Sequence, residues 1–519
     1  MKKRKVGFLF NIITICLAVV AIAVGVYSLQ KSSLNISGSL GFTAHAVNAR
    51  IDAYMYGYAT EVNGIPLTES EKVRLTSANG LLIQDTLTNY NLNLGATNGS
   101  GSATRYFSNL GASGKMEDIV VEITVSNTSS GTSTPKNILA NVDFANCIHS
   151  SALTGKIRID CDRSAAVLET TNGKTQATFT FKISLLPNTE GSYGDSTLTT
   201  PSNNVDLRMN LEETTYTQSQ VRTDAIAIKK FTATEVSSIK STLSITTNDS
   251  YADIYPYYIE MGERENQGKI KWLIIGTRTI DSDNNETYAA LTTEDKTAFS
   301  KGLMLNKTYV MLSEKVLYTE STDNYGISFQ NAFADSSSTT PAYKNTNNDY
   351  SAQDYATSNV RSYLKGNTVQ RASSYASGVY SPSGTQVNLM TTYNLADDKM
   401  YNKIQGRTLT SLYSNIGTFN SSAIKWSSDY SGTDENLKGT TSDKLWLLSE
   451  SEVTDLLGTT SSLLKTSTYG GTASRLASWW LRSPYSSRAN YVRYVTYNGS
   501  LLNDSADHVD HGSRAAFLF

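Results

Sequence analysis

Short segments in which apolar and polar residues alternate dominate the first part of the chain, and this pattern limits the fold more than any other feature. Examples are residues 118–125, 177–184 and 205–211, and stretches rich in Gly, Ser, Asn and Thr separate such segments. Alternation places successive side chains on opposite faces of a strand, so each strand has one face to bury. Many such strands joined by polar turns are typical of an antiparallel β-sandwich. We therefore expect a β-sandwich stalk domain over residues 31–225.

The pattern changes after residues 226–256, which we interpret as a linker. Residues 269–276 form an apolar strand around a tryptophan. Ser449, followed three residues later by Glu452, has the sequence of a helix capping box. Strands and short helices together predict an α+β domain over residues 257–519. The expected fold is therefore mainly β with some α.

The last forty residues consist of two apolar blocks with a polar stretch between them. The blocks are residues 479–484 (WWLRSP) and 512–519 (GSRAAFLF). Between them, small or apolar residues recur at spaced positions: Ala489, Val492, Val495, Gly499, Leu501, Ala506 and Val509. Nearly every other residue of the stretch is Tyr, Ser, Asn, Asp, His or Arg. Asn498-Gly499 strongly favours a tight turn, so we expect a hairpin over residues 494–501.

Replacing the adenines of an Asn codon with other bases yields codons for a limited set of amino acids. The polar residues of this stretch all belong to that set. The stretch therefore resembles the variable repeat of the target proteins of diversity-generating retroelements, which lies at the C-terminus of a C-type-lectin-like fold. WWLRSP and the closing Gly512, Arg514 and Phe517 also resemble a domain of unknown function in surface proteins of gut Firmicutes, which is similar to formylglycine-generating enzymes. The resemblance implies a C-type-lectin-like domain at 257–519 with a variable segment at 485–513. An ordinary polar end of a sheet domain is the alternative.

The resemblance assigns roles to two sets of residues. The expected ligand-binding residues are Tyr485, Ser486, Ser487, Arg488, Asn490, Tyr491, Arg493, Tyr494, Tyr497, Asn498, Asn503, Asp504, Asp507, His508, Asp510 and His511. Among these, the tyrosines and Arg493 are the best candidates for binding hot spots, because binding energy concentrates in such residues. The expected structural residues are Trp479, Trp480, Arg482, Gly499, Gly512, Arg514 and Phe517.

The function predicted from these features is recognition of an unknown protein or glycan ligand outside the cell, without an enzymatic step, a cofactor or a metal. Enzymes of the related fold need cysteines, and the second domain has none. Its only histidines lie in the variable segment, which leaves no His for a conventional Ser/His/Asp triad. Two alternatives from other classes stay open. One is a structural matrix or pilus-like subunit, and the other is an enzyme that acts on an extracellular polymer through two converging carboxylates.

The N-terminus predicts where the protein is located. A basic cluster at residues 2–5 precedes an apolar run at residues 6–27, which is about long enough to cross a bilayer as a helix. Residues 1–30 are therefore interpreted as a transmembrane anchor or a long signal segment, with the remainder extracytoplasmic. The formal net charge of −2 gives no strong field, so nucleic acid is not an expected partner.

Two of the three cysteines lie in the predicted sandwich. Cys147 and Cys161 are fourteen positions apart and flank a strand-like segment. An oxidising compartment would allow a disulfide between them, and two free buried thiols are the alternative.

Overall fold

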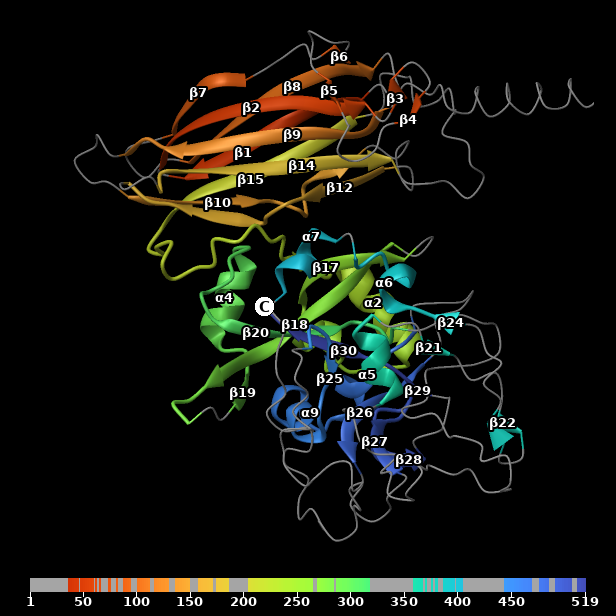
Figure 1. Cartoon of the computed structure of the whole chain (residues 1–519). Coiled ribbons are helices and arrows are strands. Elements are labelled where there is room, and N and C mark those ends of the chain that lie inside the picture. The colour runs from red at the N-terminus through yellow and green to blue at the C-terminus, as the bar shows by residue number, and fades with distance from the viewer. Residues whose placement is uncertain are drawn as a thin grey trace, which may run out of the picture. The chain divides into compact units, whose positions relative to one another are not determined.

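The computed structural model describes residues 36–317, 358–404, 443–468, 476–484, 491–505 and 511–519, apart from shorter interruptions within the first two ranges. The chain divides into two compact units (Figure 1). Unit 1 contains Met1–Ala227 and Ser300–Asn306, and unit 2 contains Ile228–Phe299 and Lys307–Phe519. The segment predicted as a linker therefore belongs almost entirely to unit 2.

Unit 1 is built from two large β-sheets. Its strands are β1 (Ile36–His45), β2 (Val47–Ala59), β3 (Glu61–Val62), β4 (Ile65–Pro66), β5 (Val73–Leu75), β6 (Leu81–Leu82), β7 (Leu87–Leu94), β8 (Ser100–Ala112), β9 (Met116–Asn127), β10 (Asn137–Val142), β11 (Ile148–His149), β12 (Ile157–Cys161), β13 (Ala165–Leu168), β14 (Gln176–Leu185) and β15 (Asn204–Thr214). One sheet has the order β13-β10-β15-β1-β8-β6, with β11 on β15. The other has the order β12-β14-β9-β2-β5, with β7 on β2, and β3 pairs with β4.

A single apolar core joins the two sheets of unit 1. On β14, Phe179, Phe181 and Ile183 are buried, whereas the residues between them are at least partly exposed. These three side chains pack in one cluster with Phe42 of β1 and Leu207 of β15, which belong to the other sheet. The two-sheet architecture follows directly from the alternating sequence pattern.

One pairing departs from the expected antiparallel arrangement. Strands β1 and β15 are parallel, with Leu40 opposite Leu207. The two strands come from opposite ends of the unit, so no hairpin connects them and the chain direction is free to be parallel. The sandwich is therefore mixed.

Unit 2 is organised around a seven-stranded sheet. Its strands are β16 (Lys229–Lys230), β17 (Tyr257–Arg264), β18 (Gly268–Ile280), β19 (Glu286–Ala290), β20 (Thr308–Ser313), β25 (Trp446–Leu447) and β30 (Ala515–Leu518). The order is β16-β17-β18-β20-β30-β25, with β19 on β18. The C-terminal strand β30 thus lies inside the sheet. Phe517 is fully buried there and its ring meets that of Trp272 edge-on.

A second, four-stranded sheet in unit 2 carries the C-terminal polar stretch. It consists of β26 (Ser478–Pro484), β27 (Tyr491–Val495), β28 (Leu501–Ser505) and β29 (His511–Gly512), in the order β28-β27-β26-β29. The structure also describes two short ribbons in this unit: β21 (Val369–Gln370) with β24 (Gln386–Val387), and β22 (Tyr375–Ala376) with β23 (Val379–Tyr380).

Short helices surround these sheets (Figure 1). They are α2 (Ala233–Leu243), α3 (Tyr251–Ile254), α4 (Thr293–Ser300), α5 (Asn359–Leu364), α6 (Leu389–Thr392), α7 (Lys399–Lys403), α9 (Glu450–Leu457) and α10 (Ser461–Leu464). Helix α9 begins with the predicted capping box, in which Ser449 and Glu452 each accept from the backbone N–H of the other. Its apolar residues Val453, Leu456 and Leu457 are buried.

The predicted transmembrane helix is corrected. Among the residues that the structure describes, no helix is long and apolar enough to cross a membrane. The longest described helix, α2, has 11 residues, whereas a bilayer needs about 20. Residues 6–27, on which the prediction rests, lie outside the described residues. The described residues thus have a mainly β fold, and neither the transmembrane helix nor the location that was predicted from it is supported.

Of the two alternatives left open for Cys147 and Cys161, the structure has the free thiols. The Cys147 sulfur accepts the backbone N–H of Arg208 on β15 at 3.2 Å. Cys161 lies on β12, in the other sheet. Burial raises the pKa of the Cys147 thiol to about 11 and holds the pKa of Cys161 well above its usual value. Both sulfurs therefore act as packed, protonated groups of the sandwich.

Candidate functional site

The predicted hairpin forms at the C-terminal sheet, where Asn498-Gly499 joins β27 to β28. Gly499 has a φ of +86°, a left-handed conformation that favours glycine. A Cβ atom at this position would lie 1.9 Å from the carbonyl oxygen of Ser461 in α10. The backbone N–H of Ser500 donates to the hydroxyl of Thr496 at 2.9 Å, which closes the turn. The turn therefore depends on a glycine both for its backbone angle and for its contact with α10.

One face of the four-stranded sheet, here called the helix face, packs toward α9 and α10. Trp479 and Val495 are opposite one another on β26 and β27 and are both fully buried. The indole N–H of Trp479 donates to the carbonyl of Leu464 at 3.3 Å. Arg493 lies two residues before Val495 and therefore on the same face. It donates through Nε to the carboxylate of Glu450 at 2.8 Å and through Nη2 to the other oxygen of that carboxylate. Arg493 thus attaches the hairpin to α9.

The opposite face, here called the tyrosine face, carries a compact aromatic group. Trp480, Tyr494 and Leu502 form one cross-strand row over β26, β27 and β28. The ring of His511 is stacked on Tyr494 with centroids 3.9 Å apart, and Trp480 meets His511 edge-on at 4.4 Å. Asp504 reaches the same imidazole, with its Oδ2 at 3.1 Å from Nε2. Aromatic and polar groups therefore converge on His511.

Exposure is uneven across the described residues. Four large hydrophobic residues are exposed, and two of them, Tyr497 at 58% and Leu502 at 48%, lie on the β27–β28 hairpin. The other two are Ile254 and Ile280. Because most large apolar side chains of a folded domain are buried, a hairpin that exposes two of them is a candidate contact surface.

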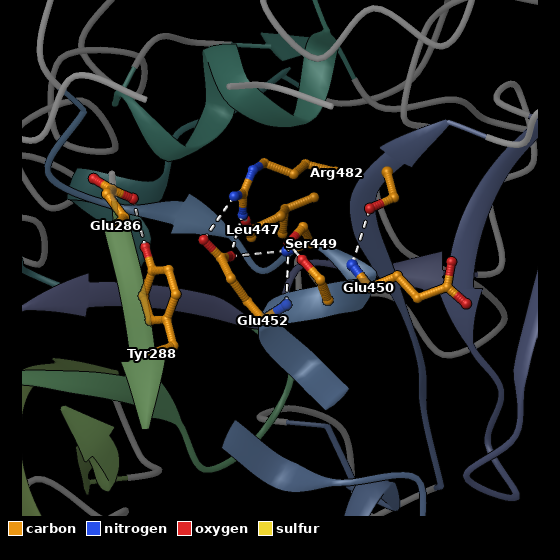
Figure 2. A network of polar contacts seen from close by, with 9 residues as sticks. Glu286, Tyr288, Leu447, Ser449, Glu450, Glu452 and Arg482 are labelled. Carbon is orange, nitrogen blue, oxygen red and sulfur yellow. Dashed lines mark hydrogen bonds and ion pairs between the residues drawn. The ribbon is translucent and has the colours of Figure 1, made fainter. Parts of the chain in front are cut away.

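A buried ion pair holds the base of this sheet to α9 (Figure 2). Arg482 of β26 donates through Nη2 to Glu452 at 2.6 Å, and its Nη1 donates to the other Glu452 oxygen and to the carbonyl of Leu447 at 2.7 Å. The same carboxylate accepts the backbone N–H of Ser449 at 2.9 Å. Both charged side chains are almost inaccessible, at 1% and 3% exposure. Arg482 and Glu452 therefore connect β25, β26 and the N-terminus of α9.

A second carboxylate stands beside this pair (Figure 2). Glu286 of β19 accepts the hydroxyl of Tyr288 at 2.8 Å and a guanidinium N–H of Arg278 at 2.6 Å. Burial, with the nearby Glu452, raises the pKa of Tyr288 well above its usual range. Each of the two carboxylates is thus paired with its own arginine. This arrangement favours a structural network over a catalytic carboxylate pair.

The closing block fixes the end of the chain. Arg514 is fully buried and donates through Nε to the carbonyl of Ser313 at 3.0 Å. Its guanidinium lies 5.2 Å from the ring centroid of Trp479 and 5.6 Å from that of Tyr251. The nearby Gly512 is also buried and pairs with Trp479 across β26 and β29. This block links the two sheets of unit 2.

The structure describes about half of the residues predicted to bind ligand. Tyr485, Ser486, Ser487, Arg488, Asn490, Asp507, His508 and Asp510 lie outside the described residues, and the side chain of Tyr491 is not described. Tyr494, Asp504 and His511 are brought together on the tyrosine face. Tyr497 and Asn498 are exposed at the turn, and Asn503 pairs with Arg493 across the hairpin.

The sequence does not predict the roles of two residues in this region, Leu502 and Glu450. Leu502 follows Leu501 in an apolar pair, so the sequence does not indicate which of the two is exposed; the register of β28 opposite Tyr494 decides it. Glu450 lies in the first turn of α9, where an acidic residue is expected for helix stability alone. Its pairing with Arg493, 43 positions away, appears only in three dimensions.

Residues 306–519 match the model of a domain of unknown function, DUF6273. The match covers the C-terminal block and most of unit 2, including the four-stranded sheet and both of its faces. A comparison with curated proteins gave no match.

Proposed function

We propose that this protein is a ligand-binding protein of the receptor or adhesin type, and that the β27–β28 hairpin contributes the contact surface. This surface, here called the hairpin surface, consists of Tyr494, Tyr497, Asn498 and Leu502. The observation that carries the proposal is the exposure of Tyr497 and Leu502, half of the exposed large hydrophobic residues among those described. The ligand class is a protein or a glycan.

The chemistry of the hairpin surface suits recognition. Tyrosine offers a large rigid ring with a polar tip, and asparagine offers adaptable hydrogen bonds, which is the combination that dominates binding loops of antibodies. The residues that support this surface are fixed: Trp480 and Val492 are fully buried, and Arg493 is paired with Glu450. A supported surface loses less conformational entropy on binding than a flexible loop does.

The proposal includes diversification of this surface by a retroelement, which the set of polar amino acids in the stretch favours. Its support is the position of the spaced apolar residues. Val492 and Val495 are fully buried, and Gly499 is confined by α10, so these positions do not tolerate free exchange. Tyr497 and Asn498, which the pattern marks as variable, are exposed. Arg493 and His511 are also predicted to be variable, yet each has a partner in the structure: Arg493 pairs with Glu450, and His511 contacts Asp504.

The diversification is tested at the level of DNA. The region downstream of the gene is sequenced and searched for a second near-copy of codons 485–513 and for a reverse-transcriptase reading frame. A near-copy that differs from the gene only where the copy has adenine supports a diversified surface. A reading frame without such a copy, or no copy at all, leaves a fixed surface and contradicts this part of the proposal.

Binding is tested by a screen of the full chain on a glycan array and on an array of purified bacterial and host surface proteins. Replacement of Tyr497 and Leu502 together by Ala is expected to abolish the signals that the wild-type chain gives. The matched control is Ile280→Ala, which removes a similarly exposed apolar side chain from the end of β18. Equal binding by all three chains would contradict the proposed surface and favour a structural subunit.

The proposal is for recognition without catalysis. Its support is the absence of cysteine from residue 257 onward and the pairing of both carboxylates in the buried network with arginines. Hydrolysis of any of the arrayed glycans by the purified chain would contradict it.

A further inference from the structure

The ring of His511 is surrounded by groups from three strands. Tyr494 on β27 is stacked against it with an interplanar angle of 17°, and Trp480 on β26 meets it edge-on at 81°. Asp504 on β28 contacts its Nε2 at 3.1 Å. His511 itself is 4% exposed, whereas Tyr494 is only partly buried. The histidine therefore lies beneath a tyrosine that reaches the surface.

Tyr494 depends on these neighbours for its orientation. Its ring is held by His511 on one side and meets Trp480 edge-on with centroids 6.0 Å apart. Asp504 lies two residues from Leu502, the cross-strand partner of Tyr494, and therefore on the same face of the sheet. Burial, with the negative charge of Asp504, raises the pKa of Tyr494. Asp504 thus acts on both stacked rings, and a change in His511 or Asp504 reaches Tyr494 directly.

We infer that His511 and Asp504 are positioning residues for Tyr494, and that the protonation of His511 determines how firmly this tyrosine is presented. The inference rests on the proposed function, because Tyr494 belongs to the hairpin surface. His511 and Asp504, which were predicted to contact the ligand directly, would then support the hairpin surface instead. A substitution at either position would then change binding specificity through the orientation of a neighbouring ring.

The direction of the pH effect follows from the groups that face His511. The titratable groups in contact with its ring include Asp504 on β28 and Tyr494 on β27, and Trp480 on β26 adds an aromatic edge. A protonated imidazole would make a charge-assisted hydrogen bond to Asp504 and a cation–π contact with the face of Tyr494. A neutral imidazole can keep the hydrogen bond to Asp504 through its Nε2–H, but it lacks the positive charge that strengthens this bond and makes the cation–π contact. Tyr494 is therefore held more firmly at acidic pH, and this restraint weakens as the pH rises through the titration of His511.

The arrangement is measured without a ligand, by NMR of the full chain with ¹³C-labelled histidine and tyrosine rings. The chain has four histidines, so His511→Gln identifies the His511 signal by its loss. Two results are expected of the wild-type chain. The His511 ring signals are displaced by the ring currents of Tyr494 and Trp480, and the Tyr494 ring signals follow the same pH midpoint as those of His511.

Asp504→Asn is the deciding variant. Removal of an opposite charge in direct contact is expected to move the His511 midpoint to lower pH by about one unit or more. The matched control is Asp455→Asn, an exposed aspartate on α9, which is expected to leave the midpoint unchanged. An unchanged midpoint in Asp504→Asn overturns the inference.

A measurement on the wild-type chain tests the inference even if the substituted chains misfold. In the wild-type chain, nuclear Overhauser effects between the rings of His511 and Tyr494 are expected to strengthen as the pH falls. Effects that are absent at all pH values overturn the inference. Failure of the array screen would instead contradict the proposed function alone, because the coupling between these rings is measured with no ligand present.

Discussion

Two neighbouring stretches near the end of the chain, residues 497–504 and 511–519, have opposite environments. Every residue from 511 to 519 is buried, and Arg514 contacts both sheets of unit 2, through the carbonyl of Ser313 and the ring of Trp479. In residues 497–504, Tyr497, Asn498 and Leu502 are exposed, although the hairpin that carries them is attached by buried groups. A buried base, residues 511–519, and an exposed edge, residues 497–504, thus lie within a few residues of each other in the sequence. Substitutions at the base and at the edge should therefore differ greatly in their effect on stability.

The largest expected loss of stability is that of Arg482→Met. This change leaves the Glu452 carboxylate buried without its arginine. Breaking a buried pair in this way costs about 3–5 kcal/mol. The measurement is urea unfolding of the full chain followed by tryptophan fluorescence, which reports unit 2 because all five tryptophans lie there. An unchanged transition would mean that the base does not depend on this pair.

Gly499→Ala is expected to be the next most destabilising. A non-glycine residue in a left-handed conformation costs about 1–2 kcal/mol. The clash of the new Cβ with the Ser461 carbonyl adds to this cost. The matched control is Gly268→Ala, which has a similar φ of +77° but no atom within 4 Å of the new Cβ. Equal losses in the two variants would show that the contact between the turn and α10 is unimportant.

Arg493→Met probes the attachment of the hairpin at its partly exposed side. The side chains of Arg493 and Glu450 are 18% and 27% exposed, so solvent screens the pair. Its removal is therefore expected to cost no more than about 1 kcal/mol. The same unfolding measurement checks this value against Arg482→Met. A loss of stability as large as that of Arg482→Met would show that the fold depends on the Arg493–Glu450 pair as strongly as on the buried Arg482–Glu452 pair.

The smallest expected effect on stability is that of Tyr497→Ala with Leu502→Ala. Both side chains are about half exposed. Surface substitutions of this kind usually change stability by about 0.5 kcal/mol or less. The unfolding transition should match that of the wild-type chain, while the array signals disappear. A marked loss of stability would show that the two side chains serve packing instead of recognition.

Several elements were predictable from local pattern. The alternation at residues 177–184 gives β14 with its buried Phe179, Phe181 and Ile183, and Ser449 with Glu452 gives the start of α9. Asn498-Gly499 gives the turn between β27 and β28. Each of these rests on residues within one element or one turn, where the spacing of side chains alone determines which face is buried.

Other features were wrong or invisible because they depend on long-range partners. The parallel pairing of β1 with β15 joins strands from opposite ends of unit 1, and no local pattern distinguishes it from an antiparallel one. The sequence left a disulfide and two free thiols open for Cys147 and Cys161, and the structure has free thiols, with the Cys147 sulfur hydrogen-bonded to the backbone of Arg208. The sequence also did not indicate that the guanidinium of Arg493, an expected ligand contact, is paired with Glu450.

The sequence by itself determined the mainly β character of the chain, the position of the hairpin and the apolar residues that hold it. It did so because side-chain periodicity and turn chemistry act over a few neighbouring residues. Only the tertiary structure decided which of the polar residues face outward and which, like Arg493 and His511, are held by partners on α9, β27 and β28. A charged or aromatic side chain has the same appearance in a sequence whether it is exposed or paired, because its role depends on which distant groups the fold brings to it.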